Sequence, residues 1–238
     1  MKVCRTALVA LVALASAGAS AVWAQDGKKA PNSPVGIGTN WSNTVTKEGP
    51  GGGLELDKKQ MELVQKVTVY FRDLPDIKGN FVQTNADGKT QRGKIYFKRP
   101  GRFRFDYARP SRQVIVSDGT QMAIQDPDVN SDDRVELDQT PFRVLLRQDV
   151  DLVRDARILE VQEVDGMIVL ALQDKSPDTV GRIKLYLSQK PTLELKQWIT
   201  TDAQGLDTRL DLSDITKGEE LDAALFKPQS IGLKRLQQ

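Results

Sequence analysis

The chain has 238 residues, with 34 Lys and Arg against 32 Asp and Glu, one cysteine and no histidine. The absence of histidine excludes Ser-His-Asp and Cys-His nucleophilic sites and the usual zinc sites, and a single cysteine cannot form an internal disulfide. The balanced charge argues against a nucleic-acid partner, which usually needs a basic face.

The N-terminus has the pattern of a secretory signal peptide. Two positive residues precede an apolar run, Thr6–Val22, and small residues lead to Ala24. This order is typical of an exported chain, and we predict cleavage after Ala24, with Ala21 as the second choice. A membrane anchor is the alternative, but a run of only about 17 residues rich in Ala and Gly is at the short limit for a spanning helix.

Residues 25–54 have the composition of a flexible linker. They contain Pro31, Pro34, Pro50 and a glycine cluster that ends at Gly53. Such a segment has too few apolar side chains to bury a core. We therefore predict a signal peptide over 1–24, a linker over 25–54 and one domain over 55–238. Without the signal peptide, which holds Lys2 and Arg5, the chain from residue 25 onward carries no net charge.

The domain begins with a predicted helix over Leu56–Leu74. Asp57 favours its start, and Pro75 ends it. Apolar residues recur at helical spacing and form one stripe. The residues of this stripe are Leu63, Val64, Val67, Phe71 and Leu74.

The rest of the domain is predicted to be mostly strands. Short turn motifs such as Asp118-Gly119 and Asp165-Gly166 separate them, and the second is a strong hairpin signal. The predicted strands are 78–84, 91–98, 102–108, 112–117, 120–125, 134–138, 156–164, 167–173, 181–188, 194–202 and 208–214. About eleven short antiparallel strands predict a mainly β fold, a sheet curled around one apolar face.

The inner face of this sheet follows from period-two alternation, which places alternate side chains on opposite faces. Between Arg102 and Tyr107 every second residue is aromatic. The faces alone do not distinguish a packed core from a cavity, because both need the same residues. The residues that we predict to line a cavity are Ile95, Phe97, Phe105, Tyr107, Met122, Ile124, Phe142, Leu145, Leu170 and Leu185.

Two short helices are predicted to interrupt the strands, at Thr140–Leu146 and Asp149–Arg154. Thr140 is a candidate N-cap before Pro141 at the first helical position. A further helical turn is predicted within Gly218–Phe226. A curled sheet needs a plug at its open end, and the first helix and the 140–146 helix can supply it.

An acidic stretch is the weak sign of an enzyme. Asp126, Asp128, Asp132 and Asp133 are predicted to share one loop. The stretch lacks the glycine and the terminal glutamate of a calcium loop, and acidic loops are more often solvated turns. We therefore predict no enzyme activity, no metal and no cofactor.

Several motifs together carry a family resemblance. They are F-V-Q at Phe81–Gln83, G-K-I-Y-F-K-R-P-G-R-F-R-F-D-Y at Gly93–Tyr107, V-S-D-G at Val116–Gly119 and T-P-F-R-V-L-L at Thr140–Leu146. In this order and spacing they resemble the LolA family of periplasmic lipoprotein carriers, over about 56–228. The resemblance implies an unclosed antiparallel β-barrel with a helical lid over an apolar cavity.

The resemblance also implies functions for two residues. Arg99 matches an arginine that bonds lid groups and holds the empty cavity shut, and Phe103 matches a residue at the cavity mouth that receives cargo. The implied cargo is triacylated lipoprotein, taken from an inner-membrane lipoprotein-releasing transporter and passed to an outer-membrane acceptor. The implied protein is a periplasmic monomer.

Two other binding proteins with this fold are alternatives. An outer-membrane acceptor similar to LolB would carry a lipidated cysteine after its apolar run and a hydrophobic loop. Here Cys4 precedes the run, and the corresponding turn Arg109–Arg112 is polar. A periplasmic module that senses lipid or peptide would normally have a second domain, for which the chain offers only a short tail after Ser230.

Overall fold

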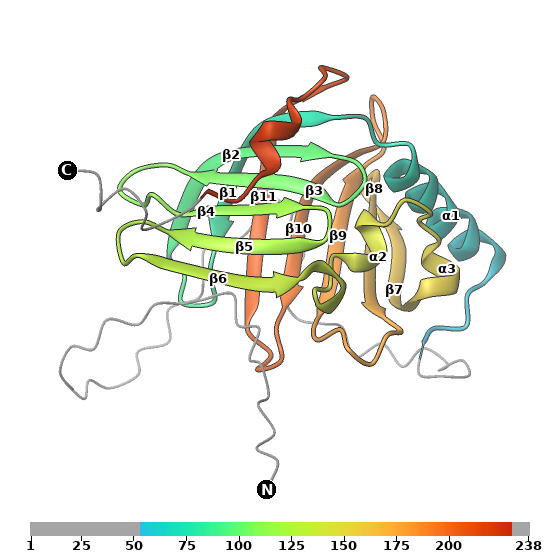
Figure 1. Ribbon diagram of the computed structural model, residues 1–238. Helices are drawn as coiled ribbons and strands as arrows, with labels where there is room; N and C mark the ends of the chain where they lie inside the picture. The colour runs from blue at the N-terminus through green and yellow to red at the C-terminus, as the bar shows by residue number, and fades with distance from the viewer. Residues whose placement is uncertain (1–52, 230–238) are drawn as a thin grey trace, which may run out of the picture.

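Eleven strands form one antiparallel sheet in the computed structural model, which describes residues 53–229 (Figure 1). Their order is β6-β5-β4-β3-β2-β1-β11-β10-β9-β8-β7, so two meanders meet where β1 pairs with β11. The edges β6 and β7 do not pair, and the predicted unclosed barrel is confirmed. The strands are β1 Ile77–Thr84, β2 Thr90–Lys98, β3 Arg102–Tyr107, β4 Val114–Asp118, β5 Gln121–Asp126, β6 Ser131–Glu136, β7 Ala156–Val164, β8 Met167–Asp174, β9 Arg182–Ser188, β10 Glu194–Thr201 and β11 Asp207–Lys217.

The open side of the sheet is crossed by the chain between β6 and β7. These two strands are consecutive in sequence but lie at opposite edges, so their connection must span the gap. It contains η1 (Leu137–Gln139), α2 (Arg143–Leu146) and α3 (Leu152–Asp155). In Figure 1, α2 and α3 lie beside α1 at one end of the curled sheet. The strand order therefore requires the segment with η1, α2 and α3, which forms the lid, to lie over the open side of the sheet.

Helix α1 (Lys58–Arg72) packs its apolar stripe against this end of the sheet. Asp57 caps it as predicted, since its carboxylate accepts from Gln60 N at 2.8 Å while Gln60 Oε1 accepts from Asp57 N at 3.0 Å. This reciprocal capping box satisfies two donors that a helix start leaves free. The buried residues of α1 are Leu63, Val64, Val67 and Phe71, all from the predicted stripe.

The two faces of the sheet are used differently. The inner face carries the main hydrophobic core, whereas the outer face of β3 and β4 is covered by η2 (Ala223–Phe226). Arg104 on the outer face of β3 donates to Leu225 O at 3.1 Å, and Phe226 is buried. The helical turn predicted within Gly218–Phe226 is therefore a shorter 3₁₀ turn at the end of that range, and it fastens the C-terminal segment to the barrel wall.

The two helices of the lid are shorter than predicted. Thr140 does not cap α2, because Phe142 occupies the N-cap position and the Thr140 hydroxyl donates to Leu137 O at 2.8 Å instead of accepting from a helix N–H. Helix α2 begins instead at Arg143. Helix α3 is capped by Asp151, whose carboxylate accepts from Arg154 N at 2.9 Å.

The acidic loop was predicted too long. Asp132 and Asp133 belong to β6, and the strand predicted at 134–138 ends at Glu136. An edge strand exposed to water tolerates such polar residues, so β6 has no apolar alternation to reveal it. Arg134 donates to Asp132 at 3.0 Å along the same strand.

The start of the domain also differs from the prediction. Leu54, assigned to the linker, donates its N–H to Ile158 O on β7 at 2.8 Å and so belongs to the folded domain. The predicted signal peptide and residues 25–52 of the predicted linker lie outside the described residues.

Candidate functional site

An apolar cavity of about 70 Å³ lies between the inner face of the sheet and the helices at its open end. Residues from α1, α2 and the strands β1–β3 and β9–β11 enclose it. Every residue on its wall is aliphatic or aromatic, and the indole N–H of Trp198 is the single polar group among these side chains. The lining residues are Phe71, Leu74, Ile77, Ile95, Phe97, Phe103, Phe105, Phe142, Leu145, Leu146, Ile183, Leu185, Leu195, Trp198 and Leu212.

A second, smaller cavity of about 30 Å³ continues into the barrel. Its wall is mostly apolar but includes Gln83, Thr200 and Thr208. The other residues on its wall are Phe103, Phe105, Tyr107, Ile115, Met122, Phe142, Trp198 and Leu210. The barrel interior thus holds two separate spaces.

Eight of the ten residues predicted to line a cavity do so. Ile95, Phe97, Phe105, Phe142, Leu145 and Leu185 line the first cavity, and Phe105, Tyr107, Met122 and Phe142 line the second. Ile124 and Leu170 line neither and are buried in the packed core. Each lies on a strand next to a sheet edge, where Leu170 pairs with Val161 of β7 and Ile124 pairs with Asp133 of β6. The alternating pattern correctly predicted that Ile124 and Leu170 face the interior of the sheet, but it carries no information about how far each residue lies from a cavity.

Phe103 is enclosed in this conformation. It is 5% exposed and lies on the walls of both cavities, and its position near the cavity mouth stays a prediction. Its ring packs edge-on to Phe105, with centroids 5.7 Å apart, and lies near Phe142. Phe103 is therefore an interior wall residue.

Trp198 on β10 is the main lining residue that the sequence analysis missed. A bulge between Leu195 and Gln197 shifts the register of β10 against β9 and interrupts the regular alternation. The signal that could have found Trp198 is the lone tryptophan within a predicted strand, because an aromatic side chain of that size is rarely left in water.

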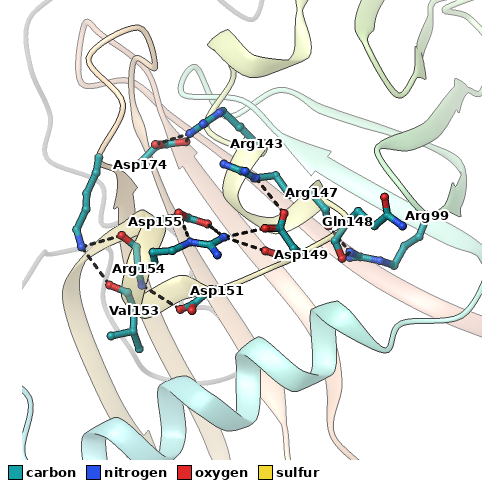
Figure 2. Close-up of polar contacts among 11 residues, drawn as sticks. Arg99, Arg143, Arg147, Gln148, Asp149, Asp151, Val153, Arg154, Asp155 and Asp174 are labelled. Atoms are coloured by element: carbon teal, nitrogen blue, oxygen red, sulfur yellow. Dashed lines mark hydrogen bonds and ion pairs between the residues drawn. The ribbon is translucent and has the colours of Figure 1, made fainter.

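Arg99 lies in the turn between β2 and β3 and fastens the lid to α1. Figure 2 shows its side chain beside Arg147 and Gln148 of the lid. Its guanidinium donates to Phe71 O at the end of α1. It also donates to three carbonyls of the lid, Leu145 O at 3.4 Å, Gln148 O at 3.2 Å and Arg147 O. One planar group with five donors thus ties together two chain segments that no sheet pairing joins.

The charge of Arg99 suits these acceptors. The last carbonyls of a helix have no partner inside the helix and carry partial negative charge, which favours a cation there. Burial lowers the pKa of Arg99, and the nearby carboxylate of Asp73 acts in the opposite direction. A guanidinium stays protonated in proteins, so Arg99 is a permanent positive charge at the join.

A second contact holds the lid to the barrel wall. Arg143 at the start of α2 donates to both carboxylate oxygens of Asp174 at the end of β8, at 2.9 and 3.0 Å (Figure 2). The Asp174 side chain is fully buried and also accepts from Ser176 N at 2.7 Å. This bond raises the pKa of Arg143. Helix α2 is therefore held at its start by Arg143 and at its end by Arg99.

Ion pairs continue through α3. Arg154 pairs with Asp155 at 2.7 Å and with Asp149 at 3.2 Å, and Lys175 donates to Val153 O and Arg154 O at 3.0 Å (Figure 2). The guanidinium of Arg154 lowers the pKa of Asp155. These contacts make the lid segment polar on the outside while its apolar residues face the first cavity.

Residues 53–229 contain no cluster of His, Cys, Asp or Glu suited to hold a metal ion. Across the same residues no helix has the length and apolar character needed to cross a bilayer.

A model of a protein family described as outer membrane lipoprotein carrier protein LolA matches residues 72–229. The chain belongs to the LolA family. An outer-membrane lipoprotein carrier protein of Chromohalobacter salexigens is 29% identical over 201 residues, which are 81% of this chain and 90% of the relative. A protein of the same name from Leptothrix cholodnii is 32% identical over 156 residues, 62% of this chain and 71% of the relative.

A solved LolA superfamily protein from Nitrosomonas europaea aligns with 71% of this chain and 97% of its own, at 16% identity and a TM-score of 0.42. The LolA match along the sequence contains the whole sheet, Arg99 and the lid, whereas nearly all of α1 precedes it. The first relative covers more of the chain than the family model does.

Proposed function

We propose that this chain is a periplasmic carrier that accepts lipoproteins released from the inner membrane, shields their acyl chains in the barrel and delivers them to the outer membrane. One observation carries the proposal: the chain belongs to the LolA family, and its barrel contains a wholly apolar cavity closed by a lid. We further propose a signal peptide over 1–24, a linker from residue 25 that ends before Leu54, a monomeric carrier domain after it, and an inner-membrane transporter and an outer-membrane acceptor as partners.

The volume of the closed cavity requires the lid to move. A cavity of about 150 Å³ is needed to hold even benzene, whereas the first cavity measures about 70 Å³. We infer that the described conformation is a closed one, with the lid over the cavity. Loading must separate α1 and α2 from the strands that they cover, and the acyl chains then take the place of the lid's own apolar side chains.

The energy of closure fits a carrier that must also release. Each bond from Arg99 contributes about 1 kcal/mol net, so its four bonds contribute on the order of 4 kcal/mol. Burying one methylene contributes about 0.8 kcal/mol. The free energy regained when the lid closes again thus offsets the burial of about five methylenes. Three acyl chains contain many more methylenes than this, so lid closure lowers the affinity for lipoprotein without abolishing it.

The LolB-like acceptor is not favoured. The family match is to the carrier, and the turn after β3 that would carry a hydrophobic loop residue in an acceptor contains exposed Arg109 and Arg112. We propose that the protein is not an enzyme, because its interior offers apolar side chains where a reaction would need ionisable ones.

Replacement of Arg99 tests the proposal. In Arg99→Leu the closed state loses all four bonds, so the loaded state is favoured by comparison. We expect lipoprotein to load normally from a reconstituted transporter but to pass poorly to the acceptor. Arg99→Lys keeps the charge but not the planar set of donors, and we expect an intermediate loss of transfer.

Arg102→Leu is the matched control, since Arg102 lies three residues away at the start of β3, where its backbone pairs with Lys98 of β2 and Asp118 of β4. Its transfer should equal that of the parent. Equal transfer by Arg99→Leu and Arg102→Leu at equal loading would remove Arg99 from the lid mechanism. Failure of the parent to load lipoprotein at all would refute the carrier function itself.

A further inference from the structure

Four aromatic rings form a closed circuit inside the barrel. Phe103 contacts Phe105 at 5.7 Å between centroids, Phe105 contacts Trp198 at 6.2 Å, Trp198 contacts Phe142 at 6.1 Å, and Phe142 contacts Phe103 at 6.4 Å. All four rings line both cavities. We call this set the aromatic partition, because it is the wall that the two cavities share.

The aromatic partition joins opposite sides of the barrel. β3 and β10 are four strand spacings apart along the sheet, roughly 19 Å. The 6.2 Å contact between Phe105 and Trp198 therefore spans the interior instead of following the sheet. Three of the rings stand on the paired strands β3 and β10, so the sheet fixes the backbone that carries them.

Phe142 is the exception within the partition. It is the residue just before α2, on the lid segment, and it belongs to no strand. Its helix is the one that Arg99 holds through Leu145 O and Arg147 O. A movement of the lid that withdraws Phe142 would leave a gap between Phe103 and Trp198 and join the two cavities.

The second cavity suits the end of an apolar chain. Three of the polar side chains on its wall already have partners within the protein: Tyr107 Oη donates to Gln83 Oε1 at 2.6 Å, Gln83 Nε2 donates to Asn85 at 2.7 Å, and Thr200 Oγ1 donates to Thr208 O at 3.4 Å. A ligand there gains nothing from polar groups and would otherwise have to break these bonds. Only apolar surface remains for it to bury.

We propose that the second cavity is the inner end of the acyl-chain site and that Phe142 is the gate to it, opened when the lid moves. The proposal rests on the carrier function. A long acyl chain then runs through the aromatic partition, with its middle beside Trp198 and its methyl end beside Met122 and Ile115. A short chain stops in the first cavity and does not pass Phe142.

Quenching of Trp198 measures the depth of the chain. The full chain with Trp23 and Trp41 replaced by Phe retains Trp198 as its only tryptophan. It is titrated with palmitate carrying bromine near the carboxylate, at mid-chain or at the methyl end, and binding is followed separately with radiolabelled palmitate. We expect the mid-chain bromine to quench most, because the methyl end lies beyond the partition.

Strongest quenching by the methyl-end bromine would overturn the proposal, since the chain would then stop at the partition. Binding of radiolabelled palmitate without quenching at any position would also overturn it. In the first case the first cavity still binds an acyl chain and the carrier function stands. In the second case the chain binds away from Trp198, which lines both cavities, so the result counts against an acyl-chain site inside the barrel. Absence of palmitate binding would count against the carrier function as well.

Filling the second cavity gives an independent test. Met122→Phe places a larger side chain in the second cavity only, and Leu210→Phe does the same from β11 should the first variant fail to fold. We expect palmitate affinity to fall about 10-fold, the effect of excluding roughly two methylenes, with decanoate affinity unchanged. Met122→Leu, which conserves volume, is the control. An equal loss for both chain lengths, or no loss for palmitate, would overturn the proposal.

Discussion

At the scale of single residues, Tyr107 shows how the barrel tolerates a polar group in an apolar interior. Its ring packs edge-on to Phe81 with centroids 5.1 Å apart, and its hydroxyl donates to Gln83 Oε1 at 2.6 Å. Burial raises the pKa of this phenol above its usual value of 10.0. The hydrogen bond removes the cost of burying the hydroxyl, which would otherwise be large.

We predict that Tyr107→Phe destabilises the domain at neutral pH by about 1–2 kcal/mol, because the oxygen of Gln83 loses its donor while it remains buried. Urea unfolding followed by tryptophan fluorescence measures this loss. Unchanged stability would mean that Gln83 finds another partner.

The raised pKa also predicts how stability depends on pH. A phenol with a higher pKa in the folded chain than in the unfolded chain contributes stability that is complete below pH 10 and lost as pH rises through the folded pKa. Burial likewise raises the pKa of Tyr186, to about 12. We predict that stability falls above pH 10 and that the fall is shallower in Tyr107→Phe. Parallel curves for the two proteins would contradict the assignment to Tyr107.

At the scale of elements, the lid is a short segment held mainly by side chains. Helix α2 has four residues, too few to be stable alone, and its position depends on the Arg143–Asp174 pair and on Arg99. Its apolar residues Val144, Leu145 and Leu146 are buried beneath it. A lid of this kind can exchange a few polar contacts for cargo without disturbing the sheet.

We predict that Arg143→Met destabilises the domain by about 3–5 kcal/mol, because the Asp174 carboxylate would remain buried without its partner. Adding Asp174→Asn should recover much of this loss. Arg147→Met is the control, since its ion pair with the exposed Asp149 spans 3.5 Å and should contribute little. Thermal unfolding of the parent, of these two single variants and of the double variant measures each loss of stability. Equal losses of stability in Arg143→Met and Arg147→Met would refute the anchoring function of Asp174.

At the scale of the whole molecule, strand order links the lid to the cavity. Because the two edge strands are consecutive in the chain, the segment that joins them must lie over the gap between them. The first cavity is enclosed on one side by that segment and on the other by strands from both meanders. Loading therefore changes the state of the whole barrel, not of one loop.

We predict that an acyl ligand stabilises the folded protein as a whole. A ligand that binds only the folded state at 100 times its Kd contributes about 2.7 kcal/mol. For a domain of this size that corresponds to a rise of about 5–10 °C in Tm, measurable by scanning calorimetry with palmitate. An unchanged Tm at saturating palmitate, with binding established by radiolabel, would mean that unfolded chain binds equally well.

The sequence by itself determined the strands, their turns and the face that each turns inward. These are local properties, because period-two alternation and turn chemistry act within a few residues of chain. Asp57 as a helix cap and eight of the ten lining residues were predictable for this reason. The family motifs further indicated Arg99 as the arginine that bonds the lid.

Only the tertiary structure decided what meets inside the barrel. The contact of Phe105 with Trp198, the enclosed position of Phe103 and the carbonyls that Arg99 reaches all join segments far apart in sequence. They depend on how strongly the sheet curls and on bulges such as the one between Leu195 and Gln197, which shift register. Inward-facing residues alternate in the same way around a packed core and around a cavity. The volume left empty between the strands and the lid therefore depends on their positions in space and cannot be predicted from the alternation.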